Sequence, residues 1–310
     1  MKKIWAAFLF LRPLNLLMVF AVFWIFEYFL FEPLLNQYAL GLTLSSHQLD
    51  LLATSISLVA ASGYMINDWK DRDIDTINRP NRFLLRYPVS KKVFFRLYAF
   101  VIFFGFAFSA YVAFTLDKAG WVWLYPFFVL LMWFYAAKLK LKGVWGNSLV
   151  SIAICIIPWL LVLAELPSLE KLALINKDAF ALLIYHVFAL SICMALANFV
   201  REVVKDAQDE KGDSAFGSES IYLKYGVRAT RITCVVSVLT LLVIEIGLVL
   251  LSPWMTQAFL FCGLSIGILT LIISYKILIS RKKSEFSSVS MQLKLLMLFG
   301  LLQVAFLTPN

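Results

Sequence analysis

The sequence predicts an all-α membrane protein with nine transmembrane helices, and three observations support this fold class. Hydrophobic residues make up 62% of the 310 positions, whereas charged residues make up only 15%. The mean hydropathy of +0.84 is too high for a soluble chain of this length to bury its apolar surface. Apolar stretches of spanning length recur along the chain, and basic residues alternate between the loops that join them.

Each predicted helix is an apolar stretch of about 20 residues, the length needed to cross the hydrocarbon core. The first follows a Lys-Lys start without a small-residue cleavage pattern, so we expect it to be retained. No soluble segment interrupts the series, and we therefore expect one membrane domain over residues 1–310. The nine spans are placed at about 5–31, 48–66, 93–116, 119–137, 147–165, 179–200, 230–251, 255–279 and 289–308.

Basic residues concentrate in every second loop, which predicts the orientation of the chain. The loops 32–47 and 252–255 contain no Lys or Arg, and 117–119 contains only Lys118. The net charge of +9 is therefore a topology signal, not a nucleic-acid signal. We expect a multi-pass protein of a bacterial or archaeal cell membrane, with a cytoplasmic N-terminus and an external C-terminus.

Two acidic clusters share the spacing D-x2-D-x3-D, and each follows a long apolar stretch. On a helix this spacing places three carboxylates on one face, where their mutual repulsion calls for cations. Mg²⁺ suits such a face because it binds one or two carboxylates together with substrate phosphates. The predicted metal ligands are Asn67, Asp68, Asp71 and Asp75 in the first cluster, and Asp206, Asp209 and Asp213 in the second.

Four spans separate the two clusters, so both should lie on the cytoplasmic side, although two acidic loops can also share a spacing by chance. Facing one another across a cavity, they would hold a diphosphate between metal ions. The long loops 67–92 and 200–229 mix charged and apolar residues, which favours ordered helical caps over that cavity.

Basic side chains near the clusters are candidates to bind the remaining phosphate charge, and Arg suits bidentate contact. A cytoplasmic Lys or Arg can equally be only a topology signal. The candidates are Arg79, Arg82, Lys140, Arg201 and Lys205. We expect Asp71, Asp209 and Lys140 to be the catalytic residues.

Arg12 lies inside the apolar start of the first span, followed by Pro13. Ionisable residues at membrane depth usually face an interior cavity, and snorkelling to the interface is the alternative. We therefore include Arg12 among the candidate substrate-binding residues.

These motifs together resemble the UbiA superfamily of intramembrane prenyltransferases. The first cluster resembles that family's N-D-x-x-D-x-x-x-D, and the second its D-x-x-x-D with an upstream K-D. Arg12-Pro13-x-Asn15 resembles the first-helix R-P-x-N, and residues 135–147 resemble the Y-S-P-x-L-K…G-N segment, with Lys140 at the lysine position. By this resemblance, Asn15 and Tyr135 join the candidate substrate-binding residues.

The resemblance implies nine helices around a central cavity and Mg²⁺-dependent transfer of a polyprenyl group from its diphosphate to a lipid-like or aromatic acceptor. Residues 74–82 and 201–206 look most like the (geranylgeranyl)glyceryl-phosphate prenyltransferase branch, which implies ether-lipid synthesis. The sequence departs from that branch at 82–87, where the usual R-P-I-P-S-G is replaced by Arg82-Phe83-Leu84-Leu85-Arg86-Tyr87.

Two other functions remain open from the sequence. One is prenyl transfer to an aromatic or porphyrin acceptor in quinone or haem biosynthesis. The other is secondary transport, although transporter sites lie near the bilayer midplane, and these carboxylates lie at the ends of spans.

Overall fold

The computed structural model describes residues 11–81, 85, 89–281 and 283–307, and this part of the chain is almost entirely helical. Within it, nine segments are long and apolar enough to cross a membrane, and the one β-type contact is an isolated bridge between Met255 and Leu307. The predicted fold class, an all-α multi-pass membrane protein, is therefore confirmed.

The chain divides into two compact units, which are described separately. The first comprises residues 1–21, 45–142 and 211–218, and the second comprises residues 22–44, 143–210 and 219–310. The prediction of a single domain over residues 1–310 is not tested by this division.

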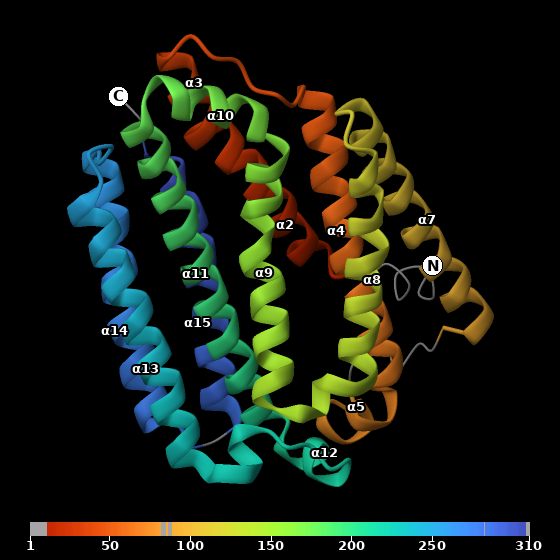
Figure 1. The fold of residues 1–310 in the computed structure, drawn as a ribbon. Coiled ribbons are helices and arrows are strands. Elements are labelled where there is room, and N and C mark those ends of the chain that lie inside the picture. Colours follow the sequence, from red (N-terminus) through yellow and green to blue (C-terminus); the bar gives the residue numbers. More distant parts are fainter. Residues whose placement is uncertain (1–10, 82–84, 86–88, 282, 308–310) are drawn as a thin grey trace. The chain divides into compact units, whose positions relative to one another are not determined.

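The first unit is built on three long helices that lie side by side in Figure 1: α4 (Ser46–Lys70), α7 (Lys91–Thr115) and α8 (Leu124–Phe134). Gly105 of α7 allows the close approach of its neighbours, since a Cβ there would lie 2.0 Å from the Tyr125 hydroxyl of α8. The Ser55 hydroxyl of α4 donates to the Gly105 carbonyl at 2.9 Å. These contacts fix α4 against its neighbours, and the first acidic cluster begins in the last turn of α4.

Short helices complete the first unit. They are α5 (Arg72–Asn78), η2 (Ala119–Trp123), η3 (Tyr135–Leu139), η4 (Lys140–Lys142) and α12 (Glu210–Ala215), of which residues 211–215 belong to this unit. The first residues of α2 (Pro13–Phe26) also belong here, and the Ser57 hydroxyl donates to the Leu16 carbonyl at 3.3 Å. Helices α5 and α12 agree with the expected ordered caps.

The second unit is organised around α11 (Lys177–Gln208), which packs against three other long helices. These are α9 (Val144–Ala164), α13 (Ile221–Leu251) and α15 (Lys283–Val304), and α14 (Gln257–Ile279) packs on α13 and α15. Their contacts bury an apolar cluster that includes Val200, Val204, Cys234, Ile273 and Val289. This packing fixes the end of α11, where the second acidic cluster begins.

A further helix of the second unit, α10 (Leu166–Ile175), was not predicted from the sequence. Glu165 precedes it, is completely buried, and accepts hydrogen bonds from the backbone N–H groups of Thr43 and Leu44, both at 2.7 Å. Ser168 of α10 donates to the Gly41 carbonyl at 2.7 Å. The loop 38–45 is thus tied to α10 by a buried carboxylate and a hydroxyl.

Several helices extend beyond their predicted ends. The first spanning segment begins at Pro13 in the described residues and continues to Gln37 through the π-helical turn η1 (Glu27–Phe31) and α3 (Glu32–Gln37). Helices α4 and α11 run four and eight residues past the predicted ends, at 66 and 200, into the acidic clusters. Helix α13 begins at Ile221, not 230, and is kinked at Gly226, whose φ is +78°.

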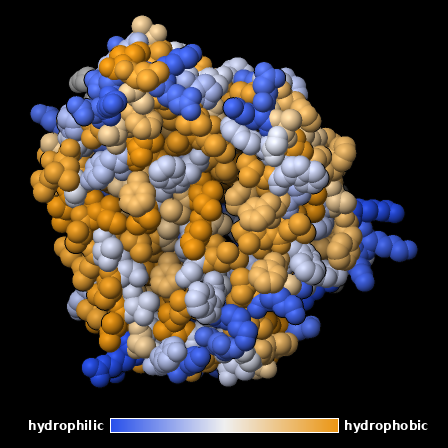
Figure 2. Space-filling model, viewed as in Figure 1, coloured by the Kyte–Doolittle hydropathy of each residue, from blue (hydrophilic) through white to orange (hydrophobic). Residues whose placement is uncertain are grey.

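Hydrophobic side chains cover much of the molecular face drawn in Figure 2. Large apolar residues stand exposed along the spanning helices, including Phe103, Phe127, Leu130, Val243 and Phe261. Exposed apolar surface of this extent is suited to contact with lipid tails, since a soluble monomer rarely exposes apolar patches larger than a few hundred Å².

Candidate active site

The first acidic cluster lies where α4 ends and α5 begins. Helix α4 stops at Lys70 and Asp71 joins the two helices, but the helical hydrogen bonds continue across the junction. The N–H of Asp71 donates to the Asn67 carbonyl, and the N–H of Asp75 donates to the Asp71 carbonyl. The carboxylates of Asp68, Asp71 and Asp75 are all buried, in agreement with the shared helical spacing.

Two basic side chains pair with this cluster. Arg12 Nη2 lies 2.5 Å from Asp68 Oδ1, and its guanidinium lies over the Tyr64 ring, 4.8 Å from the ring centroid. Lys140 Nζ pairs with Asp71 Oδ2. Burial raises the pKa of Asp71 above its ordinary value, although the ammonium of Lys140 acts in the opposite direction. The cluster is therefore a set of desolvated acids balanced by specific cations.

Lys140 is brought to Asp71 by an irregular end of the fourth span. The segment from Tyr135 to Leu139 is π-helical, and a short 3₁₀ turn follows from Lys140 to Lys142. Such π-helical turns are rare and occur frequently at functional sites. Tyr135, which is half-buried, opens this turn.

Asn67 supplies the feature that best fits a metal ion. Its Nδ2 donates to Asp71 Oδ2 at 2.8 Å, while its Oδ1 is buried and accepts no hydrogen bond from the described residues. In the part of the chain that the structure describes, no three His, Cys, Asp or Glu side chains form a preformed metal cage. Mg²⁺ does not need one, because it completes its octahedral shell with waters and substrate phosphates. The oxygen-rich donor set therefore fits Mg²⁺.

The remaining candidates of the first unit have different surroundings. Arg79 caps the end of α5 and is half-buried, and Asn15 lies in the first turn of α2, where its N–H donates to the Arg12 carbonyl at 2.8 Å. Arg82 lies outside the described residues.

Asp213 contacts the short helix α5, which follows α4, through the side chain of Asn78. Asn78 Nδ2 donates to Asp213 Oδ1 at 3.3 Å, and Asn78 Oδ1 accepts from the Gly212 N–H at 2.7 Å. A Cβ on Gly212 would lie 2.6 Å from the Asn78 amide, so this contact requires glycine. Sequence reasoning placed Asp213 among the metal ligands but did not single out Asn78, whose position in the Ile77-Asn78-Arg79-Pro80 segment was the available signal.

The second acidic cluster lies where α11 ends. Asp206 is in the last turn, and Asp209 follows the final residue, Gln208, with its N–H donating to the Lys205 carbonyl. Asn147 Nδ2 of α9 donates to Asp206 Oδ2 at 2.8 Å. That the two clusters face one another stays a prediction.

Glu202 connects the two basic candidates of the second unit. Its carboxylate accepts from Arg201 Nη1 at 2.8 Å and from Lys205 Nζ at 2.6 Å. Sequence reasoning assigned Arg201 and Lys205 but gave Glu202 no role, because a single acid between two bases carries no spacing signal. Glu202 holds both cations on the last turns of α11.

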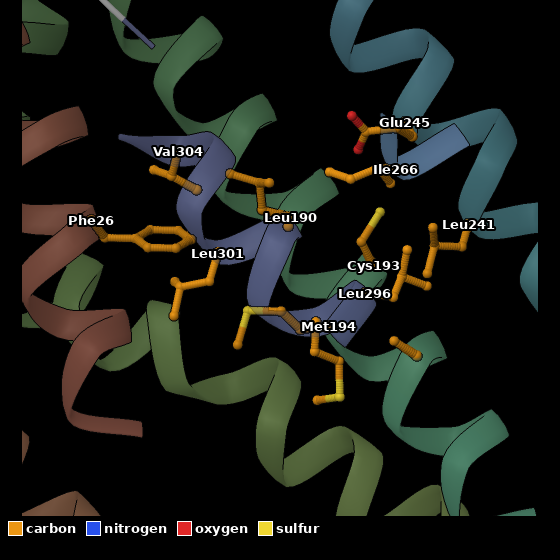
Figure 3. Close-up of a pocket in the computed structure, with 13 residues that line it drawn as sticks. Phe26, Leu190, Cys193, Met194, Leu241, Glu245, Ile266, Leu296, Leu301 and Val304 are labelled. Carbon is orange, nitrogen blue, oxygen red and sulfur yellow. The ribbon is translucent and has the colours of Figure 1, made fainter. Parts of the chain in front are cut away.

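An apolar pocket lies along α11 in the second unit, with a volume of about 460 Å³ including its open mouth. Figure 3 shows Leu190, Cys193 and Met194 of α11 lining it together with side chains of α2, α13, α14 and α15. Glu245 is the one charged residue among those that line it, and its Oε1 accepts from Gln303 Nε2 at 2.6 Å. The pocket is suited to a hydrocarbon chain.

Comparison with known families bears on the choice between prenyl transfer and transport. The profile of the UbiA prenyltransferase family matches residues 37–297. The chain belongs to the UbiA prenyltransferase family. This membership favours prenyl transfer over secondary transport.

Two curated relatives carry the same name. A digeranylgeranylglyceryl phosphate synthase of Korarchaeum cryptofilum is 31% identical over 176 residues, which are 56% of this chain and 55% of the relative. The enzyme of the same name from Thermococcus sibiricus is 28% identical over 66% of this chain and 68% of the relative. The matched part of the chain thus spans between about half and two thirds of these relatives.

Two solved structures share the fold. One, described as giving structural and mechanistic insights into digeranylgeranylglyceryl phosphate synthase in membranes, has a TM-score of 0.62 and 21% identity over 98% of both chains. The other is the apo structure of a UbiA homolog from Aeropyrum pernix K1, with a TM-score of 0.62 and 14% identity over 91% of this chain and 96% of that chain. At these identities, the likeness supports the fold.

Proposed function

We propose that the protein transfers a polyprenyl group from its diphosphate to a prenylated glycerol phosphate, in a Mg²⁺-dependent reaction of ether-lipid synthesis. The observation that carries this proposal is the first acidic cluster, three buried carboxylates balanced by Arg12 and Lys140 at the end of a spanning helix. Family membership and the names of the curated relatives support the reaction class.

Asn67, Asp68, Asp71, Asp75, Asp206 and Asp209 would hold the metal ions, and Asp213 is the weaker candidate because of its contact with Asn78. When bound, Mg²⁺ would screen the diphosphate and stabilise the negative charge that develops on it as it departs. The side chains of Lys140, Arg79, Arg201 and Lys205 would bind phosphate oxygens not held by the metal, and their charge favours the same departure. Asp71 and Lys140 would thus act together: the carboxylate of Asp71 binds the metal, and the ammonium of Lys140 binds the phosphate.

The apolar pocket along α11 would receive the far end of the prenyl tail. Cys193 lies thirteen residues before Asp206, which corresponds to about 20 Å along an α-helix. A tail extending from the second cluster to this pocket would be buried among apolar side chains. Its burial excludes water, which would otherwise capture the allylic cation formed on departure of the diphosphate. The ring of Tyr135 is a candidate to stabilise that cation, whereas the ring of Tyr64 already contacts Arg12.

The acceptor is assigned from the relatives and from the number of basic residues. Both curated relatives named above are digeranylgeranylglyceryl phosphate synthases. Arg79, Arg82, Lys140, Arg201 and Lys205 exceed the need of one diphosphate, so they could divide between the donor and an acceptor phosphate. The primary hydroxyl of the acceptor would attack the allylic carbon as its bond to the diphosphate breaks, which forms an ether and releases diphosphate and the hydroxyl proton.

The assignment is tested by acceptor competition in vesicles that contain the purified protein, geranylgeranyl diphosphate and Mg²⁺. The acceptors offered together are geranylgeranylglyceryl phosphate, 4-hydroxybenzoate and a dihydroxynaphthoate. We expect the mass of the doubly prenylated ether lipid. Exclusive C-prenylation of an aromatic acceptor would refute the ether-lipid assignment and leave prenyl transfer standing.

A further inference from the structure

A chain of buried polar side chains joins α9 to α11 and ends at Asp206. Asn198 Nδ2 donates to Ser151 Oγ at 3.3 Å, Ser151 Oγ donates to the Asn147 carbonyl at 2.7 Å, and Asn147 Nδ2 donates to Asp206 Oδ2 at 2.8 Å. Asn147, Ser151 and Asn198 are each at most 5% exposed. The bond from Ser151 reaches the backbone carbonyl of Asn147, and the Asn147 side chain in turn reaches one carboxylate of the second acidic cluster.

The spacing of these residues confines them to one face of each helix. Asn147 and Ser151 are four residues apart on α9, about one turn, and Asn198 and Asp206 are eight apart on α11, about two turns, so each pair lies on one side of its helix. Burying an amide or hydroxyl in apolar surroundings costs free energy unless it is hydrogen-bonded. Apolar side chains would pack at these positions equally well. We therefore connect the polar character of this face with its hydrogen bond to the Asp206 carboxylate.

The position of Asn147 is fixed by the start of α9. Gly143 precedes that helix with a φ of +52°, and a Cβ there would lie 2.2 Å from the Glu219 carbonyl oxygen. The Asn147 N–H donates to the Gly143 carbonyl at 3.0 Å, so one helical turn connects the fixed glycine to the asparagine. Asn147 therefore presents its amide to Asp206 from a rigid element.

We propose that Asn147 is a positioning residue for the second metal-binding set, and that Ser151 and Asn198 support it. Its amide N–H holds one carboxylate oxygen of Asp206, which fixes the plane of that carboxylate toward a divalent cation bound with a diphosphate. The inference rests on the proposed function, in which Asp206 is a metal ligand. Partners of this kind typically change metal affinity by about 10- to 100-fold when they are removed.

The test measures metal binding without turnover. Free Mn²⁺ is followed by electron paramagnetic resonance as it is titrated into the full-length protein in detergent, with inorganic pyrophosphate present. We expect Asn147→Ala to weaken Mn²⁺ binding about 10-fold or more. In the Asp206→Asn background the same substitution should change binding less than about twofold, because a positioning residue acts only through the group it positions.

Two further variants separate positioning from folding. Asn147→Asp keeps the size of the side chain but replaces the donor with a carboxylate, and it should weaken Mn²⁺ binding at least as much as Asn147→Ala. Ser191→Ala is the matched control, since this buried hydroxyl of α11 donates within its own helix, to the Val187 carbonyl at 2.6 Å. The control should leave Mn²⁺ binding unchanged, and thermal melts should show that all variants are folded.

Three results would overturn the inference, and they are distinguishable. Unchanged or tighter Mn²⁺ binding in Asn147→Asp would show that the amide donor has no role. Equal losses from Asn147→Ala in the wild-type and Asp206→Asn backgrounds would show that Asn147 contacts the ligand independently. Normal binding in Asp206→Asn would remove Asp206 from the metal site, and with it both this inference and that part of the proposed function.

Discussion

At the residue scale, three acids of the first cluster are buried, and acids of both clusters have polar partners from elsewhere in the chain. Asp68 pairs with Arg12, Asp71 with Lys140, Asp206 with Asn147, and Asp213 with Asn78. Carboxylates one helical turn apart repel each other, and burial strengthens that repulsion because the effective dielectric falls. The partners therefore offset part of this repulsion at a site suited to a divalent cation.

The pair between Lys140 and Asp71 predicts a specific effect of Lys140→Met. The Lys140 side chain is 28% exposed and that of Asp71 10%, so the loss of stability should fall between that of surface and buried pairs, at about 1–2 kcal/mol. We expect a lower Tm without metal, and partial recovery with Mg²⁺ because the metal supplies the missing positive charge. Turnover should fall about 100-fold or more if Lys140 also contacts the departing diphosphate.

Lys138→Met is the control, since Lys138 lies on the same π-helical turn but is exposed. It should leave both Tm and turnover unchanged. Equal Tm values for Lys140→Met and wild type, with and without Mg²⁺, would contradict the role of Lys140 as the partner of Asp71.

At the scale of helices, the apolar pattern predicted which segments span the membrane but not where each one ends. The spans 48–66 and 179–200 end in the sequence where charged residues begin, yet α4 and α11 continue to Lys70 and Gln208. A helix continues as long as its backbone bonds are satisfied, whatever its side chains contact. Helix α10 was missed because its ten residues are too few for a span, and its anchor Glu165 was placed at the end of the predicted span 147–165.

Glu165, the buried residue before α10, predicts how the stability of the protein depends on pH. Burial raises the pKa of Glu165 above its ordinary value of 4.5, although the N–H groups of Thr43 and Leu44 act in the opposite direction. The folded protein then binds more protons than the unfolded chain between pH 4.5 and the raised pKa, so this residue's contribution to stability falls as pH rises through that window. Glu165→Gln removes the titration and one acceptor, which should cost about 1–3 kcal/mol.

We therefore expect the Tm of wild type to exceed that of Glu165→Gln, with the largest difference near pH 4.5 and a smaller one above the raised pKa. Glu170→Gln, an exposed change on α10, should follow wild type at every pH. A difference between wild type and Glu165→Gln that grows with pH would show that the pKa is depressed, contrary to this prediction.

At the scale of the whole molecule, basic loops that alternate along the chain predict its orientation in the membrane. The described residues contain nine segments long and apolar enough to span, and an odd number of spans predicts that the two ends of the chain lie on opposite sides. Reporter fusions after Lys142 and after Asn310 should therefore report the cytoplasmic and the external side, respectively. The same side for both fusions would mean that the number of spans between them is wrong by an odd number.

Sequence motifs identified most of the candidate site, because carboxylates at helical spacing and a cation one loop away carry a strong signal. They gave no role to Glu202, or to Asn78 and Asn147 within the matched segments 74–82 and 135–147, because these residues act by contacting other side chains across the fold. A lone amide in an apolar helix has no spacing that predicts its partner. These contacts became visible only when segments distant in sequence were brought together.

The central claim is that both acidic clusters carry the transfer of the prenyl group. The most direct measurement is the rate of prenyl transfer by purified Asp71→Asn and Asp209→Asn in vesicles with saturating Mg²⁺. Asp73→Asn serves as the control, since this exposed residue falls outside the shared spacing. We predict that each of the two variants stays folded and loses at least about 100-fold in rate, whereas the control keeps wild-type activity. A near-normal rate in either folded variant would contradict the two-cluster site.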